Sequence, residues 1–246
     1  MENIMLSIII ASFNDPDLDR TMADIKAKAR GEIEIVPILN KPMRQAINEG
    51  VSQSRGEWLM KCDAHCVFDE GFDVKVLANI DKNWIVIPRR YKFDTRKWEV
   101  MNEPPIDYMK LFTSAEKIGG VEWKRDGREN IMVDETMVFQ GSCWFMSRDH
   151  WNWLGGLQTE GYGTFTQEPI ELALKTWLGG GKVMVNKNTW YAYKHRKLGR
   201  TYAGLTHSQE VKDGNAYSRD FWLNNRWGRR IHDLGWLIER FNLKQI

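Results

Sequence analysis

Short apolar segments alternate with amphipathic ones over the first third of the chain, and this alternation limits the possible folds more than any other feature. The run MLSIIIASF at 5–13 is followed by a segment with helical periodicity, and the same order then repeats. The pattern predicts strands at 5–13, 32–39, 57–65 and 84–90, and helices at 17–30, 44–55 and 72–80. Strands separated by helices are typical of a parallel sheet with right-handed crossovers. We therefore expect an α/β fold, with a mostly parallel sheet flanked by helices.

The second half of the chain is less regular. Residues 92–135 are polar and predict an irregular stretch or a small antiparallel excursion. Further elements are expected as a strand at 137–148, a helix at 169–181 and a strand at 182–195. The helix has Pro169 in its first turn and glycines at its end, the usual asymmetry of helix termini. The tail is amphipathic and helical, so we expect one domain over 1–205 and a helical C-terminal extension over 206–246.

Composition excludes several classes of protein. The net charge of +2 gives no overall field that would attract a nucleic acid or a membrane, and the basic residues of the last quarter are read first as a solvated face. Three cysteines form no disulfide framework, which indicates a reducing compartment. The start of the chain lacks the features of a signal peptide, and its apolar run is too short to span a bilayer. We therefore expect a cytoplasmic protein without a transmembrane segment.

Polar residues follow the first and third expected strands. Asn14 and Asp15 come after the first, and Asp63 and His65 close the third. Ligands of open α/β sheets bind outside the carboxyl ends of the strands, which lie along one edge. The four residues are therefore expected to share that edge.

The third strand allows three interpretations. Alternation places Asp63 and His65 on one face and Cys62 and Cys66 on the other, apolar face. A structural zinc site would need ligands from both faces, and Cys143 is distant in sequence, so the usual paired spacing is missing. The end of the strand could instead be merely polar and solvated. In the third interpretation Asp63 and His65 hold a divalent cation, for which carboxylate plus imidazole suits Mn²⁺ better than Ca²⁺.

An ordered set of motifs then resembles a known family. SIIIASFND, AINEG and GEWLMKCDAH are followed by FQGSCWFMSRDHWNWLGGL, QEPIELALKTWLGGG and YKHRK. Together they resemble the nucleotide-sugar half of GT-A glycosyltransferases of the family 2 type. The Asp-x-His form at 63–65 is similar to that of the polypeptide N-acetylgalactosaminyltransferases. The resemblance covers about 5–205. It departs from the family at Pro169, where the family has asparagine, and in the missing tryptophan-glycine pair before it.

The resemblance implies a cofactor, Mn²⁺ or Mg²⁺, and a UDP-sugar donor. It adds His195 to Asp63 and His65 as a third metal ligand, and gives Glu168 and Glu171 as catalytic candidates. Without it, both glutamates would be taken as complements to a helix dipole. With it, Glu168 faces the sugar or the acceptor hydroxyl, and the motif likeness favours retention of configuration. The candidates for binding the nucleotide sugar are Ser12, Phe13, Asn14, Arg44, Asn48, Gly141, Ser142, Arg196, Lys197 and Tyr202.

The predicted function is transfer of a sugar from a UDP-sugar to an acceptor hydroxyl on a saccharide, a protein or a hydroxylated DNA base. The basic segment 196–209 is expected to close over the bound donor, because such loops often exclude water. The alternative is a non-catalytic carbohydrate- or nucleic-acid-binding protein on the same fold, with its twelve tryptophans stacking on rings. A nucleotidyltransferase is disfavoured, since no glycine-rich basic loop follows the first strand. Donor sugar, acceptor and oligomeric state stay open.

Overall fold

The computed structural model describes residues 5–194, 201–202, 205–206, 208–244 and 246. Its helices are α1 (Leu18–Lys28), α2 (Met43–Gln53), α3 (Phe72–Leu77), α4 (Arg148–Leu154), α5 (Glu168–Leu178), α6 (Ser208–Leu223) and α7 (Leu234–Arg240). The strands up to the middle of the chain are β1 (Met5–Ser12), β2 (Glu32–Leu39), β3 (Trp58–Asp63), β4 (Cys66–Phe68), β5 (Trp84–Asp94) and β6 (Glu99–Val100). The later strands are β7 (Met109–Thr113), β8 (Ile118–Glu122), β9 (Val133–Glu135), β10 (Cys143–Ser147), β11 (Lys182–Tyr193), β12 (Thr201–Tyr202) and β13 (Leu205–Thr206).

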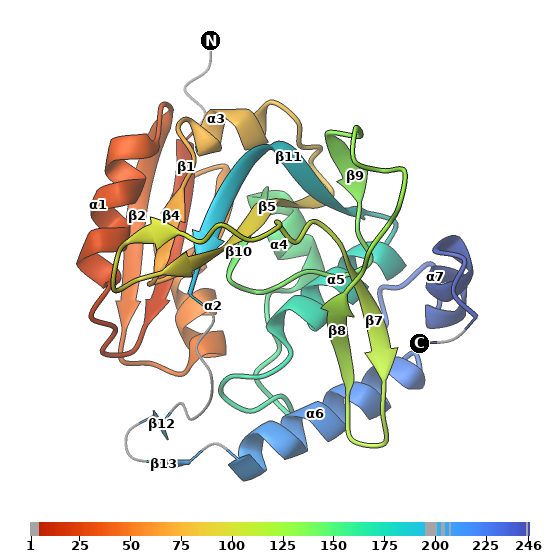
Figure 1. The fold of residues 1–246 in the computed structure, drawn as a ribbon. Coiled ribbons are helices and arrows are strands. Elements are labelled where there is room, and N and C mark those ends of the chain that lie inside the picture. Colours follow the sequence, from red (N-terminus) through yellow and green to blue (C-terminus); the bar gives the residue numbers. More distant parts are fainter. Residues whose placement is uncertain (1–4, 195–200, 203–204, 207, 245) are drawn as a thin grey trace.

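Nine strands of the described chain form one mixed, mostly parallel sheet (Figure 1). Its main order is β2, β1, β3, β10, β5, β11 and β4, with β6 on β5 and β9 on β11. β1, β2 and β3 are parallel, as are β5 and β11. β10 lies antiparallel between β3 and β5, and β4 is antiparallel to β11. The predicted α/β class is confirmed, as is a small antiparallel excursion, formed by β7 and β8.

The third strand is shorter than predicted. β3 ends at Asp63, and the chain turns through Ala64 and His65 to begin β4 on the far edge of the sheet. The Thr21 hydroxyl holds this turn, because it contacts the carbonyl oxygens of Ala64 and Cys66 at 3.0 Å each. Cys66 therefore pairs with Tyr193 of β11 and does not continue the alternation of β3.

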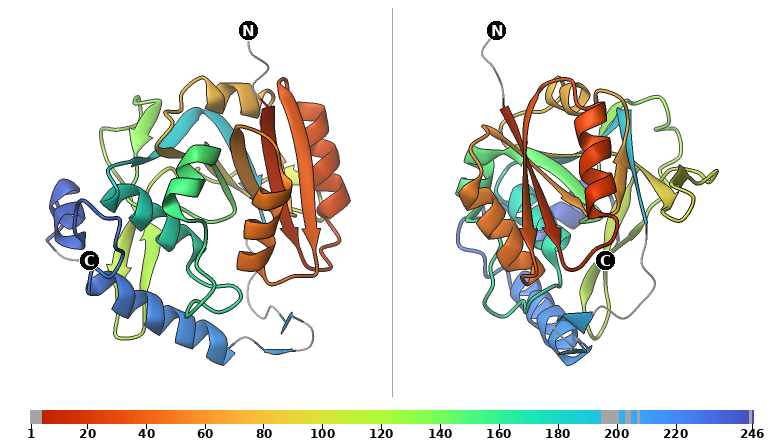
Figure 2. Two further views of the ribbon diagram at one scale, coloured as in Figure 1. Left: turned by 180° about the vertical axis from the view of Figure 1, so that it is seen from behind. Right: turned by 90° about the vertical axis from the view of Figure 1, so that its left-hand side faces the viewer.

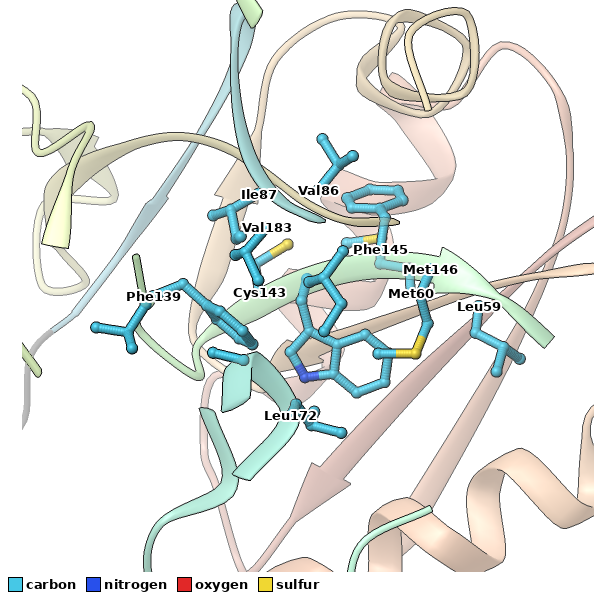
Figure 3. Close-up of a cluster of buried hydrophobic side chains, with 14 of the residues drawn as sticks. Leu59, Met60, Val86, Ile87, Phe139, Cys143, Phe145, Met146, Leu172 and Val183 are labelled. Atoms are coloured by element: carbon cyan, nitrogen blue, oxygen red, sulfur yellow. The ribbon is translucent and has the colours of Figure 1, made fainter. Parts of the chain in front are cut away.

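Two helical layers cover the sheet (Figure 2). α1 and α3 pack on one face, while α2, α4 and α5 cover the other. The central strands are buried on both faces, as β10 illustrates. Trp144 stacks on Trp151 of α4 with ring centroids 5.7 Å apart, whereas Phe145 meets Phe72 of α3. Figure 3 shows Phe145 and Cys143 of this strand within the apolar core. Core packing thus fixes β10 in the middle of the sheet and holds the ends of its neighbours in place.

The C-terminal helices pack against this body. α6 contacts β8 and buries Trp222 completely. α7 contacts α5, and its Leu237 is fully buried. The boundary proposed at residue 205 stays a prediction. No helix among the described residues is long and apolar enough to cross a membrane.

Candidate active site

Three polar residues meet at the carboxyl edge of the sheet. Asp15 follows β1, Asp63 ends β3, and His65 lies in the turn to β4. His65 Nδ1 is 3.0 Å from Asp15 Oδ2, and His65 Nε2 is 3.7 Å from Asp63 Oδ2. The side chains of Asp15 and His65 are almost fully buried, while that of Asp63 is 18% exposed. The expectation that the ends of the two strands share one edge is confirmed.

The turn after β1 fixes Asp15. Its Oδ1 accepts a hydrogen bond of 3.0 Å from the backbone N–H of Asp17, and Asn14 before it takes a left-handed conformation, with φ of 47°. Asparagine tolerates that conformation better than most residues. The ionised Asp15 Oδ2 can only accept, so His65 Nδ1 is the donor, and in the neutral tautomer that this contact selects Nε2 carries the lone pair. This carboxylate–imidazole pair is the usual support of a metal-binding histidine.

His65 Nε2 is buried and has no hydrogen-bond partner among the described residues. Leaving a buried polar atom unsatisfied costs about 1–3 kcal/mol, so such an atom needs an explanation. A divalent cation supplies one: metal bonds of about 2.1 Å allow two ligand atoms to lie 3.7 Å apart. The donor set therefore fits a metal ion. Within the described residues no group of three such ligands is assembled, and His195, the predicted third ligand, lies outside them.

Lys61 is a further member of the site, beyond the residues expected from the sequence. Its side chain is 1% exposed, and Nζ lies 2.8 Å from Asp63 Oδ1 and 3.5 Å from Glu168 Oε2. It also donates to the carbonyl oxygen of Gly141. Burial alone would lower the pKa of Lys61, but the carboxylates of Asp63 and Glu168 outweigh that effect and raise it. Lys61 thus stays charged and joins the edge of the sheet to the start of α5.

Glu168 begins α5 in the interior rather than at an open surface. It is 1% exposed, its Oε1 accepts a hydrogen bond of 2.6 Å from Trp144 Nε1, and its Oε2 faces Lys61. Burial raises the pKa of Glu168, although Lys61 and the Trp144 hydrogen bond oppose the rise. Both carboxylate oxygens are therefore engaged by the protein itself. In this arrangement Glu168 is suited to positioning its neighbours.

Arg44 and Glu171, predicted to bind the nucleotide and to act in catalysis, form a buried ion pair with both side chains at 0% exposure. Arg44 also donates to the carbonyl oxygens of Gln158 and Thr166, at 2.8 and 2.7 Å. Glu171 is further bound by Lys175 Nζ at 2.7 Å. The structure gives these groups partners within the fold, where they join α2 to α5 and to the loop between α4 and α5.

Asn48 is also engaged in the scaffold. Its side chain exchanges two hydrogen bonds with the backbone of Leu157, at 2.8 and 3.0 Å.

The other predicted donor-binding residues divide into two groups. At the end of β1, Ser12 is buried, Phe13 is half-buried and Asn14 is exposed. Before β10, Gly141 lies against Lys61, and the buried Ser142 hydroxyl is 2.8 Å from the Tyr191 hydroxyl.

Arg196 and Lys197 lie outside the described residues, and Tyr202 belongs to β12. The predicted loop over 196–209 is described only in part.

The cysteines give the zinc interpretation no support. Cys62 lies opposite Cys143 across β3 and β10, and Cys66 Sγ is 3.8 Å from the carbonyl oxygen of Ser142. All three are fully buried, and burial raises the pKa of each thiol well above its ordinary value. Thiols held neutral in a core are poor metal ligands, since zinc binds the thiolate.

Two contributors to the site escaped sequence analysis for different reasons. Lys61 lies two residues before Asp63, and the alternation of a strand already places both on one face, so a signal was available. Trp144 offers no such signal, because its contact with Glu168 depends on β10 lying antiparallel beside β3.

Comparisons with known proteins bear on the fold and on the family that the chain resembles. Residues 40–152 match the family model described as glycosyl transferase family 2. The structure of GalNAc-T7 with UDP, GalNAc and Mn²⁺ superposes over 98% of this chain and 55% of its own, with a TM-score of 0.74 and 15% identity. The chain thus spans about half the length of that protein. No curated protein matches in sequence.

A second solved structure, that of S. aureus TarS, is more distant. It superposes over 77% of this chain and 36% of its own, with a TM-score of 0.53 and 10% identity. A structure of its residues 1–349 gives the same coverage of this chain and 60% of its own, with a TM-score of 0.52 and 11% identity. The match over 40–152 and the shared GT-A fold support the predicted resemblance to glycosyltransferases of the family 2 type and to the polypeptide N-acetylgalactosaminyltransferases.

Proposed function

We propose that the protein is a metal-dependent glycosyltransferase that moves a sugar from a UDP-sugar to an acceptor hydroxyl, with retention of configuration. The observation that carries this proposal is the buried His65 Nε2, left without a hydrogen-bond partner among the described residues beside Asp63, while Asp15 fixes Nδ1. A fold that only bound carbohydrate would have no use for that unsatisfied atom. The UDP and Mn²⁺ found with GalNAc-T7 give the donor and the cation their proposed identities.

Asp63 Oδ2 and His65 Nε2 would hold the cation, with His195 as the proposed third protein ligand. When bound, the cation would stabilise the negative charge of the departing diphosphate. Asp15 keeps His65 in the tautomer that leaves Nε2 free of a proton, and Lys61 fixes the second oxygen of Asp63. The protein therefore supplies ligands whose orientation is set before the donor arrives.

Glu168 supports a retaining mechanism because it is poorly placed to act as a general base. A general base must accept a proton from a substrate hydroxyl within hydrogen-bonding reach. Glu168 is buried and both its oxygens already face Trp144 and Lys61, so it is poorly placed for that task. Retaining relatives are not expected to need such a base, and in them the carboxylate has a positioning role.

A cavity of about 550 Å³ is the proposed acceptor site. Tyr108 and Trp123 line it together with charged groups that include Arg125 and Lys187. Aromatic rings combined with fixed hydrogen-bonding groups suit sugar rings and polar polymers. Lys92 extends the lining along β5 and lies opposite Tyr193, whose ring centroid is 6.2 Å from that of His65. The acceptor would be a saccharide, a protein or a hydroxylated DNA base.

Release of UDP tests the proposal. A panel of UDP-sugars should include at least one from which the enzyme releases UDP in the presence of Mn²⁺, and EDTA should stop the release. Asp63→Ala and His195→Ala should each abolish it. Asp81→Ala and His232→Ala, which change the same residue types far from the edge of β1 and β3, should retain it. Release that survives EDTA and Asp63→Ala would refute the metal-dependent mechanism.

A further inference from the structure

The buried ammonium group of Lys61 already binds one oxygen of the proposed metal ligand Asp63. Lys61 Nζ is 2.8 Å from Asp63 Oδ1, while Oδ2 of the same carboxylate is the oxygen that faces His65 Nε2. Lys61 is 1% exposed and is held in place by the Gly141 carbonyl oxygen and by Glu168. It has little freedom to withdraw when a metal ion binds.

We propose that Lys61 makes metal binding depend on the donor, a statement that rests on the proposed function. By holding Oδ1, Lys61 restricts Asp63 to a single-oxygen ligand. Its positive charge also partly balances the one carboxylate that touches the cation. The free protein therefore binds Mn²⁺ weakly, and the diphosphate oxygens of the donor complete the site. Lys61 is on this view a positioning residue that suppresses binding of the metal alone.

The number of ligands explains why the effect depends on the donor. Mn²⁺ prefers six ligands, most of them oxygens. Without a donor, several positions are open, and a second oxygen from Asp63 would add much to binding. With the diphosphate in place, those positions are filled and the second oxygen adds little. Releasing Oδ1 from Lys61 should thus strengthen binding of Mn²⁺ alone more than binding in the presence of UDP.

The competing explanation gives Lys61 a purely structural role. Glu168 is a fully buried carboxylate, and removing its partner would leave an unpaired charge that destabilises the fold. Lys61→Met alone does not distinguish the two explanations, because it frees Asp63 Oδ1 and also leaves Glu168 without its partner. The double variant Lys61→Met with Glu168→Gln removes one positive and one negative charge, so the net charge is kept. The glutamine amide introduced by Glu168→Gln retains an oxygen that can accept from Trp144 Nε1.

The test measures free Mn²⁺ by electron paramagnetic resonance during titration, with and without UDP. In the wild type, UDP should tighten Mn²⁺ binding at least tenfold. In the double variant, Mn²⁺ alone should bind at least tenfold more tightly than to the wild type, and the enhancement by UDP should shrink. Linkage requires Mn²⁺ to enhance UDP binding by the same reduced factor, which calorimetry checks independently.

Glu168→Gln alone should not reproduce the tighter binding of Mn²⁺. Lys61 remains on Asp63, and a nearby negative charge is lost, so Mn²⁺ alone should bind no more tightly than to the wild type. The control is Arg128→Gln with Asp134→Asn, which removes a partly buried ion pair elsewhere without changing the net charge. It should leave Mn²⁺ binding unchanged even if it lowers the melting temperature.

The outcomes separate the two proposals. If the folded double variant binds Mn²⁺ with wild-type affinity, or if Glu168→Gln tightens binding, the role given to Lys61 is wrong and the proposed function stands. If the wild type binds no Mn²⁺ even with UDP, the metal site fails and the role of Lys61 fails with it.

Discussion

Replacing Arg44 by methionine should cost the protein much of its stability and leave its affinity for UDP nearly unchanged. Arg44 and Glu171 form an ion pair with both side chains at 0% exposure. Removing one partner of a buried pair costs about 3–5 kcal/mol, because the other charge stays behind in the interior. Glu171 keeps contacts with Lys175 Nζ and with the Gln158 backbone N–H, so we expect the lower end of the range, about 3 kcal/mol.

This loss translates into a readily measured change in melting temperature. For a chain of this size, each kcal/mol shifts the midpoint by about 2–4 °C, so Arg44→Met should melt about 6–12 °C lower than the wild type. Circular dichroism during heating measures the midpoint. Titration calorimetry in the presence of Mn²⁺, performed well below the lowered midpoint, should give an affinity for UDP within about twofold of the wild type. Arg44 donates its hydrogen bonds to groups within the fold and has no role in binding UDP on this view.

Arg55→Met is the matched control. Arg55 also pairs with a glutamate, Glu34, but its side chain is 79% exposed, and exposed pairs contribute about 0–1 kcal/mol. Equal losses of stability in the two variants would refute the argument from burial. An Arg44→Met protein that melts normally and has lost UDP binding would refute the scaffold role and restore Arg44 to the nucleotide pocket.

Further variants test other parts of the structure. Asp15→Asn should weaken Mn²⁺ binding in the presence of UDP by about tenfold without a comparable loss of stability, because it removes the charge that orients His65. Burial lowers the pKa of His150 to about 4 from 6.5. Between these two pH values the unfolded chain binds more protons than the folded protein. The free energy of unfolding therefore falls as the pH drops from 6.5 to 4, by about 3 kcal/mol in total. Urea midpoints at pH 7 and pH 5 should therefore differ less in His150→Gln than in the wild type, and an equal difference would contradict this assignment. Cys62→Ser and Cys66→Ser should keep the Mn²⁺ dependence of UDP release, and its loss in either variant would bring the cysteines back as metal ligands.

Most of the fold could be predicted where apolar pattern and turn residues agree. β2 has the predicted bounds, and α5 begins within a residue of its predicted start, with Pro169 in its first turn. The apolar run 137–148 predicts one strand, whereas β10 covers only Cys143–Ser147 and the helix α4 follows at once. A short apolar run does not encode the direction of its neighbours, so the antiparallel placement of β10 could not be deduced.

The candidate site was predictable to the extent that it is local. Asp63 and His65 were found because they close one strand, and their meeting with Asp15 followed from the edge that parallel strands share. The burial of the charged side chains could not be inferred from the sequence. Arg44 and Glu168 look like surface groups in the sequence, and only the packing of α2, α5 and β10 takes them into the interior.

The buried residues and the edge of the sheet form one connected polar chain. Asp15 contacts His65, His65 faces Asp63, Asp63 pairs with Lys61, and Lys61 reaches Glu168. Along this chain each carboxylate is followed by a nitrogen group, so every charge is partly balanced by a fixed neighbour. Such fixed groups need little rearrangement when charge develops on a leaving diphosphate, which is the main requirement of electrostatic catalysis. The interior position of Glu168 is then no obstacle to function: the proposed site needs a rigid support under Asp63, and the ion pair of Lys61 with Glu168 supplies it.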